Sequence, residues 1–342
     1  MTDPRGRRAI VAAMLVVVAA IVIAGWVVGR DDAAWRISTD PVPTDGLVWA
    51  AGSTVHLSDG QTIDTGGPIT AFVVAGDGVF FVSAESEEDV ASPNHGGQLK
   101  FAAPGRPPIG TGLVAVVPGH DLYASPSGRY LAVLDQSTGV EDEFGTAQPF
   151  VVAFDLKTGE QTIDSTLGMG DPDDEDYAGS ETEIGLSSVT DESLYVEAMD
   201  GNYVFDLSTG EPEKLSGYGP SDPERDDNSD MLSSPGGLWR LELAPGGQVR
   251  VVGAQGEEVT PRTDGPRWNL SWWIDDRTVV GTYKSGDKTG RDSVALMTCR
   301  VPSGECEVYE ETAGIDVVFP LGIGRVNADG QVRLAGPVLQ GQ

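Results

Sequence analysis

The chain has 342 residues, of which 53 are acidic and 22 are basic, and its formal net charge is −31 at pH 7. A surface this acidic repels nucleic acids and anionic lipid headgroups, so the composition excludes proteins that bind polyanions. Solubility is the simplest role for so much negative charge.

Residues 9–28 form the first predicted element, a run of 20 residues without a charge. A helix rises 1.5 Å per residue, so the run is about 30 Å long and matches the hydrocarbon core of a bilayer. Three arginines precede the run and two aspartates follow it, which places residues 1–8 in the cytoplasm and the C-terminal domain outside. The alternative is a cleaved signal peptide. The run is longer than the core of a typical signal peptide and no convincing cleavage site follows, so we predict a membrane anchor.

Residues 29–44 are interpreted as a short stalk, and the domain is expected to begin at residue 45. From there to residue 342 the sequence lacks long helical periodicity. It consists of short runs rich in Val, Tyr, Phe, Leu and Trp, separated by Gly, Asp, Ser and Pro, which is typical of strands and turns. The region 45–342 is therefore predicted to be one extracytoplasmic all-β domain.

One seven-residue motif occurs twice, as FDLKTGE at residues 154–160 and as FDLSTGE at residues 205–211. Glycine can adopt the positive φ that a hairpin turn requires, and the Thr before it can bond to the backbone. Related turns recur every 45 to 54 residues, and their glycines are Gly60, Gly105, Gly159, Gly210, Gly256 and Gly304. Upstream of each glycine lies a second marker, a tight turn followed by a strand with alternating side chains.

A repeat of about 45–50 residues with about four short strands is typical of a β-propeller blade. A single four-stranded sheet cannot bury both faces, whereas sheets stacked radially cover one another and expose only short edges. We therefore predict an all-β propeller of four-stranded blades. Strand-like pieces in residues 314–342, and WRIS at residues 35–38 as an edge strand, favour seven blades closed by pairing of the two chain ends. Six blades are the alternative.

Three stretches resemble the repeats of known propeller families. Residues 193–215 (SLYVEAMDGNYVFDLSTGEPEKL) and 150–161 (FVVAFDLKTGEQ) resemble the PQQ-type repeat, in which a strand ends in A-L-D-x-x-T-G. Residues 123–134 (YASPSGRYLAVL) resemble the repeat of WD40-like and TolB-like propellers. These families include enzymes, scaffolds and sensors, so the resemblance implies the fold. The PQQ enzymes place a Trp shortly after T-G and this chain does not, so no cofactor is expected.

The two cysteines, Cys299 and Cys306, bracket the residues RVPSGE. If this segment is a hairpin, the two side chains lie across the strand pair within bonding distance. An exported domain permits the bond, so we predict a disulfide, with two free buried thiols as the alternative.

Candidates for catalysis and for zinc or copper binding are few. The three histidines, His56, His95 and His120, fall in different predicted blades, and none has a metal-ligand partner close in sequence. The G-x-S-x-G motif of a serine hydrolase does not occur. We therefore predict no catalytic residue and structural roles for the histidines.

Three segments are strongly acidic, at residues 85–97, 171–183 and 220–230, and are predicted to be loops on one face. They are the candidates for binding a positively charged partner. The candidate calcium ligands in the second loop are Asp171, Asp173, Asp174 and Asp176. This loop lacks the glycine of an EF-hand loop, so a solvated loop is the favoured interpretation.

The densest aromatic stretch is RWNLSWWIDD at residues 267–276. Side chains alternate along a strand, so one face would carry Trp268, Leu270, Trp272 and Ile274. The other would carry Asn269, Ser271, Trp273 and Asp275. The first face is interpreted as core. Trp273, on the more polar face, is a candidate platform for a sugar or peptide ligand, with packing between blades as the alternative.

Together these features predict a non-enzymatic, membrane-anchored module with a monomeric propeller that binds another cell-envelope or membrane protein. The alternative is a sensor or enzyme that binds a cell-envelope saccharide or another ligand in the central funnel. Acidic residues and Trp that converge on the central channel would favour the alternative. A channel lined with small apolar residues would favour the scaffold.

Overall fold

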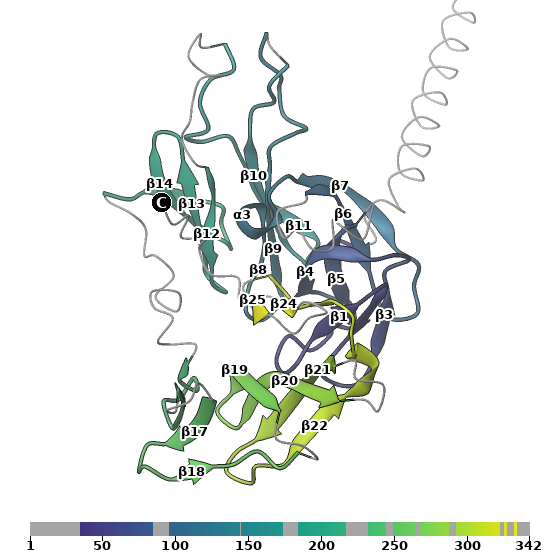
Figure 1. Ribbon diagram of the computed structural model, residues 1–342. Helices are drawn as coiled ribbons and strands as arrows, with labels where there is room; N and C mark the ends of the chain where they lie inside the picture. The colour runs from purple at the N-terminus through teal and green to yellow at the C-terminus, as the bar shows by residue number, and fades with distance from the viewer. Residues whose placement is uncertain are drawn as a thin grey trace, which may run out of the picture.

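Six antiparallel β-sheets, which we call blades 1 to 6, form the part of the chain that the computed structural model describes (Figure 1). The described residues are 35–84, 96–143, 145–173, 184–216, 232–243, 249–263, 267–286, 292–321, 325–326 and 332–333. The blades follow one another in chain order around β24 and β25, which lie near the centre of the view (Figure 1). This arrangement is a β-propeller, as the sequence repeat predicts.

The strands of each blade are short, as expected for a propeller. Blade 1 contains β1 (Trp49–Ala51), β2 (Thr54–His56), β3 (Thr62–Asp64), β23 (Val317–Val318), β24 (Arg325–Val326) and β25 (Val332–Arg333). Blade 2 contains β4 (Ile69–Ala75), β5 (Gly78–Ser83), β6 (Gly97–Ala102) and β7 (Ile109–Ala115). Blade 3 contains β8 (Leu122–Ala124), β9 (Tyr130–Asp135), β10 (Phe150–Asp155) and β11 (Glu160–Ser165).

The second half of the ring is built in the same way. Blade 4 contains β12 (Gly185–Val189), β13 (Ser193–Ala198), β14 (Gly201–Asp206) and β15 (Pro212–Lys214). Blade 5 contains β16 (Trp239–Leu243), β17 (Val249–Gly253) and β18 (Glu258–Val259). Blade 6 contains β19 (Trp268–Asp275), β20 (Thr278–Gly286), β21 (Asp292–Arg300) and β22 (Cys306–Tyr309). Two short helical turns, α3 (Pro118–Asp121) and the 3-10 helix η3 (Glu310–Thr312), connect blades 3 and 1 to their predecessors.

Blade 1 closes the ring by joining both ends of the domain. Strand β23 pairs with β1 through Ala50 opposite Val318 and Ala51 opposite Val317. Beyond β23, the backbone N–H of Leu321 donates to the carbonyl of Phe72 in blade 2, at 2.8 Å. The prediction that the two chain ends pair is thereby confirmed.

The described strands form six blades, which is the alternative that the sequence left open, and the prediction of seven is wrong. The last strands of the chain do not form a further sheet, because β24 and β25 extend blade 1 inward from β23. WRIS at residues 35–38 is not an edge strand. Its Trp35 is only 2% exposed and packs between blades 2 and 3, so this residue of the predicted stalk 29–44 is part of the hydrophobic core.

Blade 5 has three strands among the described residues, and its innermost position is represented there by one residue pair. The tight turn that precedes β16 corresponds to the turns that precede the second strands of other blades. An isolated bridge from Ser233 to Arg240 of β16 marks the position of a first strand in this blade. The repeat therefore keeps its phase through blade 5.

Neighbouring blades are held together by shared hydrophobic clusters. Such clusters join blades 1 and 2, 2 and 3, 3 and 4, 5 and 6, and 6 and 1. Each contains fully buried side chains, such as Phe154 between blades 2 and 3 and Phe205 between blades 3 and 4. Burying one such side chain contributes about 1.5–3 kcal/mol. Among the described residues, blades 4 and 5 share no such cluster.

The first copy of the repeated motif, FDLKTGE, ends β10 and starts a turn that the aspartate organises. The Asp155 Oδ1 accepts the backbone N–H of Lys157 at 2.9 Å, and the Asp155 carbonyl accepts the N–H of Gly159 at 2.7 Å. The Leu156 N–H donates to the carbonyl of Arg129 at 2.8 Å, and the Leu156 side chain is buried. Asp155, Leu156 and Gly159 of the motif thus have structural roles.

The second copy, FDLSTGE, repeats these bonds in blade 4. The Asp206 Oδ1 accepts the N–H of Ser208 at 2.9 Å, and the Asp206 carbonyl accepts the N–H of Gly210 at 2.7 Å. The Leu207 N–H donates to the carbonyl of Glu192 at 2.8 Å. All six turn glycines have a positive φ, between 68° and 86°, as predicted: Gly60, Gly105, Gly159, Gly210, Gly256 and Gly304.

The alternation of strand direction separates the connections into two faces. The turns between first and second strands and between third and fourth strands lie at one end, which we call the tight-turn face; examples are 76–77, 125–129 and 156–159. The remaining connections lie at the opposite end, the long-loop face. It carries the long connections, including 84–96, 136–149 and 166–184.

The predicted membrane anchor, residues 9–28, lies outside the described residues. Within the described residues, no helix is long and apolar enough to cross a membrane.

Candidate functional site

The three acidic segments predicted from the sequence all attach to the long-loop face. Segment 85–97 follows β5, 171–183 follows β11 and 220–230 follows β15, and each of these strands ends at that face. Most residues of the three segments lie outside the described part of the chain. The ends of β5, β11 and β15, to which the three segments attach, all lie on the long-loop face, as predicted.

A fourth acidic loop, 136–149 between β9 and β10, was missed by the sequence reasoning. It has three consecutive acidic residues and no basic one, and Glu141 and Glu143 are exposed. Between them, Asp142 accepts the N–H of Thr146 on its Oδ1 at 2.7 Å, which closes the loop. A count of acidic residues in a shorter window would have found it.

Two buried aspartates hold the base of this loop in place. The Asp135 Oδ1 accepts the N–H groups of Ser137 and Thr138 at 2.9 and 3.0 Å, so the chain turns as soon as β9 ends. Asp121, which is 0% exposed, accepts the Gln136 Nε2–H at 2.8 Å. Burial raises the pKa of Asp121, although the hydrogen bonds that it accepts oppose the shift.

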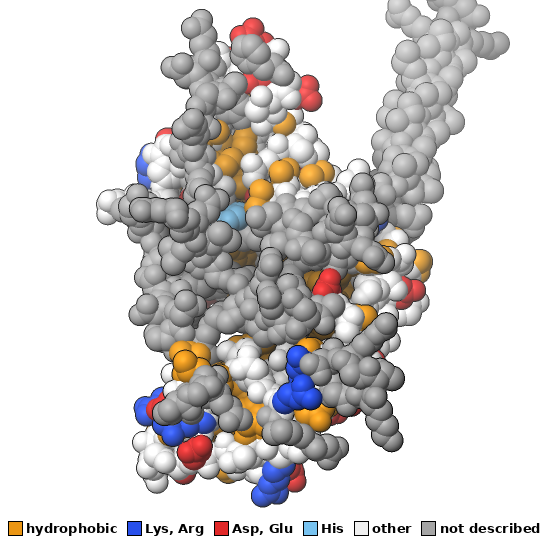
Figure 2. All heavy atoms as spheres, viewed as in Figure 1, with side chains coloured by type: hydrophobic (Ala, Val, Ile, Leu, Met, Phe, Trp, Pro, Cys, Tyr) orange, Lys and Arg blue, Asp and Glu red, His pale blue; other side chains and the backbone are white. Residues whose placement is uncertain are grey.

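The loop also contacts its neighbour on the same face. The Gln148 Nε2–H donates to the carbonyl of Gly170 at 2.6 Å, which ties the loop to connection 166–184. At its outer part, Val140 is 68% exposed, and on the adjoining connection Val116 is 41% exposed. Figure 2 shows hydrophobic and acidic side chains near one another above the place of β10. This face therefore combines negative charge with apolar contact area.

Of the predicted calcium ligands, Asp171 and Asp173 are described and exposed, and the Asp173 N–H donates to Asp171 Oδ1 at 3.0 Å. Asp174 and Asp176 lie outside the described residues. The described residues contain no cluster of three or more His, Cys, Asp or Glu side chains that could hold a metal ion. The calcium site stays a prediction.

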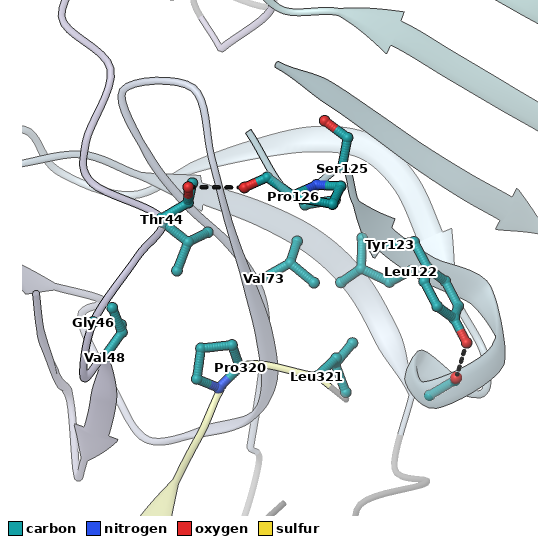
Figure 3. A pocket seen from close by; sticks show the side chains of 13 residues that line it. Thr44, Gly46, Val48, Val73, Leu122, Tyr123, Ser125, Pro126, Pro320 and Leu321 are labelled. Atoms are coloured by element: carbon teal, nitrogen blue, oxygen red, sulfur yellow. Dashed lines mark hydrogen bonds between the residues drawn. The ribbon is translucent and has the colours of Figure 1, made fainter. Parts of the chain in front are cut away.

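The innermost strands border a pocket of about 180 Å³ (Figure 3). It lies between β4, β8 and the segment after β23, and its lining is Thr44, Gly46, Val48, Val73, Val74, Gly119, Leu122, Tyr123, Ala124, Ser125, Pro126, Pro320 and Leu321. The lining contains no carboxylate, histidine, lysine or arginine. The Tyr123 hydroxyl donates to the Gly119 carbonyl at 3.2 Å. This wall offers no acid–base pair for catalysis.

A second, more polar groove of about 410 Å³ lies between blades 6 and 1. Its charged lining residues are Asp275, Arg300, Glu305 and Glu307. Tyr309 borders it, with its hydroxyl 3.5 Å from Thr298 Oγ1, and burial raises the pKa of Tyr309. The groove has the mixed polar and aromatic lining that a small polar ligand requires.

Trp273 is packed in the core between blades 5 and 6 and is only 9% exposed. Its Nε1–H donates to the carbonyl of Leu232 at 3.1 Å. The predicted alternation along β19 is wrong here, because the pairing with β20 is irregular between Leu270 and Trp272. This bulge puts Trp273 on the same side as Leu270, and Trp272 on the side of blade 1. The structure favours the packing interpretation of Trp273.

The disulfide between Cys299 and Cys306 is present, as predicted. The two residues are direct partners across β21 and β22, with Cα atoms 4.0 Å apart. Two histidines can also be placed. His56 stacks on Trp49 with ring centroids 3.7 Å apart, and burial lowers the pKa of His56. His120 lies in α3, and His95 lies outside the described residues.

No protein-family model and no curated protein sequence matches this chain. Solved structures match the chain only at low identity and low TM-score. The isopeptidase AtxE2 is 12% identical, with a TM-score of 0.35 over 89% of this chain and 52% of its own. Oligopeptidase B from Trypanosoma brucei is 12% identical, with a TM-score of 0.27 over 79% of this chain and 39% of its own.

The dihydro-heme d1 dehydrogenase NirN is 14% identical, with a TM-score of 0.24 over 85% of this chain and 74% of its own. The chain spans about half the length of the isopeptidase AtxE2. These likenesses assign no family.

Proposed function

We propose that the protein is a non-enzymatic scaffold, anchored by residues 9–28 in the membrane, whose extracytoplasmic propeller binds a positively charged envelope protein through the long-loop face. One observation carries the proposal: the four acidic segments described above all attach to this face, whereas the connections between strands on the opposite face are short turns. Connections that the fold does not need are the part of a propeller that is free to bind.

The chemistry of the long-loop face favours a protein partner. Like charges on neighbouring loops produce a negative potential, which speeds association with a basic surface and weakens as salt increases. The exposed Val140 and Val116 add apolar area that a protein interface buries. The pocket beside the innermost strands has a mostly apolar lining without a charged side chain, which supports a scaffold more than an enzyme.

The test compares two pairs of charge-removing substitutions in full-length, tagged protein crosslinked in intact cells. Glu141→Gln with Glu143→Gln alters the long-loop face, and Glu160→Gln with Glu211→Gln removes the same charge from exposed sites on the tight-turn face. We expect the first pair to reduce capture of one stoichiometric envelope partner several-fold and the second pair to leave it unchanged. Equal effects of the two pairs, or no specific capture at all, would overturn the proposal.

The groove between blades 6 and 1 favours a second candidate, binding of a small polar ligand such as a cell-envelope saccharide. Arg300 and Tyr309 provide donors and an aromatic edge within one cavity. Titration with N-acetylglucosamine oligomers, followed by calorimetry, tests this candidate. Binding that Arg300→Ala abolishes would support it, and absence of binding heat would exclude that ligand class.

A further inference from the structure

The first ten described residues, 35–44, which we call the leading segment, are bonded to the tight-turn face. The Asp77 Oδ1 accepts the Ser38 hydroxyl at 2.6 Å and the Asp40 N–H at 2.7 Å. The Asp77 Oδ2 accepts the Thr39 hydroxyl at 3.2 Å. Asp77 is in the turn between β4 and β5, so these bonds fix the segment to blade 2.

The same segment is also bonded to blade 3. The Ser38 N–H donates to the carbonyl of Leu156 at 2.6 Å, in the turn between β10 and β11. The Thr44 hydroxyl donates to the carbonyl of Pro126 at 2.8 Å, in the turn between β8 and β9. The leading segment therefore crosses two blades along the tight-turn face.

Trp35 fixes the point at which the chain enters the domain. Its ring packs edge-to-face against Phe80 of blade 2 and Phe154 of blade 3, with centroids 5.7 and 4.9 Å apart. The Arg36 guanidinium lies 5.1 Å from the centroid of the Phe154 ring. An aromatic side chain this deeply buried holds the entry point rigidly.

The chain between the predicted anchor and Trp35 is short. Residues 29–34 separate them, and a fully extended chain of this length spans at most about 25 Å. A domain of about 300 residues has a diameter of about 50 Å. The tether is thus too short for the domain to turn over and present its opposite face to the bilayer.

We propose that the leading segment mounts the propeller with its tight-turn face toward the membrane and its acidic long-loop face away from it. This inference rests on the anchoring given under the proposed function. The orientation also separates the acidic loops from anionic lipid headgroups, which would repel them. The partner must then reach the propeller from the side away from the bilayer. We therefore expect the partner to bind through an extracytoplasmic domain and not through short loops close to the membrane.

The test uses full-length protein in lipid nanodiscs whose headgroups carry an energy acceptor. A donor dye is attached to one added cysteine, Lys157→Cys on the tight-turn face or Val140→Cys on the long-loop face; both native side chains are exposed. The six-residue strands β9 and β10 separate the two faces by about 20 Å before the loops are added, so we expect energy transfer at position 157 to exceed that at position 140 at least about twofold. Trp35→Ala with Asp77→Asn should reduce this ratio while circular dichroism shows an intact fold. The single variant Asp77→Asn serves if the double variant does not fold.

The outcomes separate the inference from the proposed function. Equal transfer at the two positions, or greater transfer at position 140, would overturn the orientation while partner capture in cells remains unaffected. Failure of the chain to enter nanodiscs would overturn both the anchoring and the orientation. Loss of partner capture with the transfer ratio preserved would overturn the proposed function alone.

Discussion

Replacing Gly210, the turn glycine of the motif FDLSTGE, should destabilise the propeller more than replacing Gly256, the equivalent glycine of blade 5. Gly210 has a φ of 73°, and a Cβ added there would overlap the carbonyl oxygen of Thr162 in the outer strand of blade 3. Gly256 occupies the corresponding turn of blade 5 with a φ of 86°, but an added Cβ would meet no atom within 4 Å. The two positions share the backbone requirement and differ in their contact with a neighbouring blade.

The magnitudes follow from these two terms. An alanine with left-handed backbone angles lowers the free energy of unfolding by about 1–2 kcal/mol, and this loss should occur in both variants. Overpacking against a fixed neighbour lowers it by about a further 1–3 kcal/mol, and this second loss should occur only in Gly210→Ala. We therefore expect losses in the free energy of unfolding of about 1–2 kcal/mol for Gly256→Ala and about 2–5 kcal/mol for Gly210→Ala.

The assay is urea unfolding of the full-length protein in detergent, followed by tryptophan fluorescence. The slope of unfolding free energy against urea concentration should be equal in the two variants, so that the midpoints compare stability directly. Equal midpoints for the two variants would refute the reasoning, because they would mean that the turn of blade 4 does not rest on blade 3.

Three further predictions concern ring closure, the disulfide and pH. Phe319→Ala should cost about 3–5 kcal/mol, because its buried ring packs against Trp272 across the closure; thermal unfolding close to that of the wild type would contradict this. Replacing Cys299 and Cys306 by alanine should cost about 2–3 kcal/mol, measured as the difference in urea midpoint, and unchanged stability in reductant would argue against it. Partial burial opposes ionisation of Asp77, but the bonds from Ser38 and its neighbours outweigh burial and lower its pKa. Ionised Asp77 therefore contributes its full stabilisation of the folded state above its unfolded-state pKa, which is about 4, and this contribution is lost as the pH falls through the lower folded-state pKa. The variant Asp77→Asn should lose less stability over this acidic range than the wild type does. An identical pH profile in the variant would show that another carboxylate is responsible.

Local features of this protein were predictable because they depend on neighbours in the sequence. The positive φ at the turn glycines follows from the hairpin that FDLKTGE and FDLSTGE form, and the structure repeats even the aspartate bonds. The disulfide depends on one hairpin between Cys299 and Cys306, so the separation of the cysteines was sufficient.

Features that depend on contacts between blades were not predictable in the same way. The period of the repeat does not show that β24 and β25 extend blade 1, and this pairing decides between six and seven blades. Alternation along β19 assigned Trp273 to the wrong face, because a bulge shifts the register where two blades meet. The sequence around Trp35 resembles a stalk, and only packing between blades 2 and 3 makes it part of the core.

The candidate binding face shows the same division. Composition alone identified the acidic segments and indicated that they are loops, since charge runs cannot be buried in short strands. Their assembly on one side follows from the antiparallel direction of successive strands, which the described strand ends confirm. The bond from Gln148 to Gly170, which ties the fourth acidic loop to its neighbour, became evident only in the folded chain.

The sequence by itself determined the repeat, the turns, the disulfide and the all-β class, because each results from interactions within one hairpin or one blade. The tertiary structure decided the number of blades, the burial of Trp35 and the face to which each loop attaches. Those properties arise from contacts between segments far apart in the chain, such as Trp35 with Phe154 and Ala50 with Val318. A local sequence pattern does not specify which distant part of the chain will pack against it.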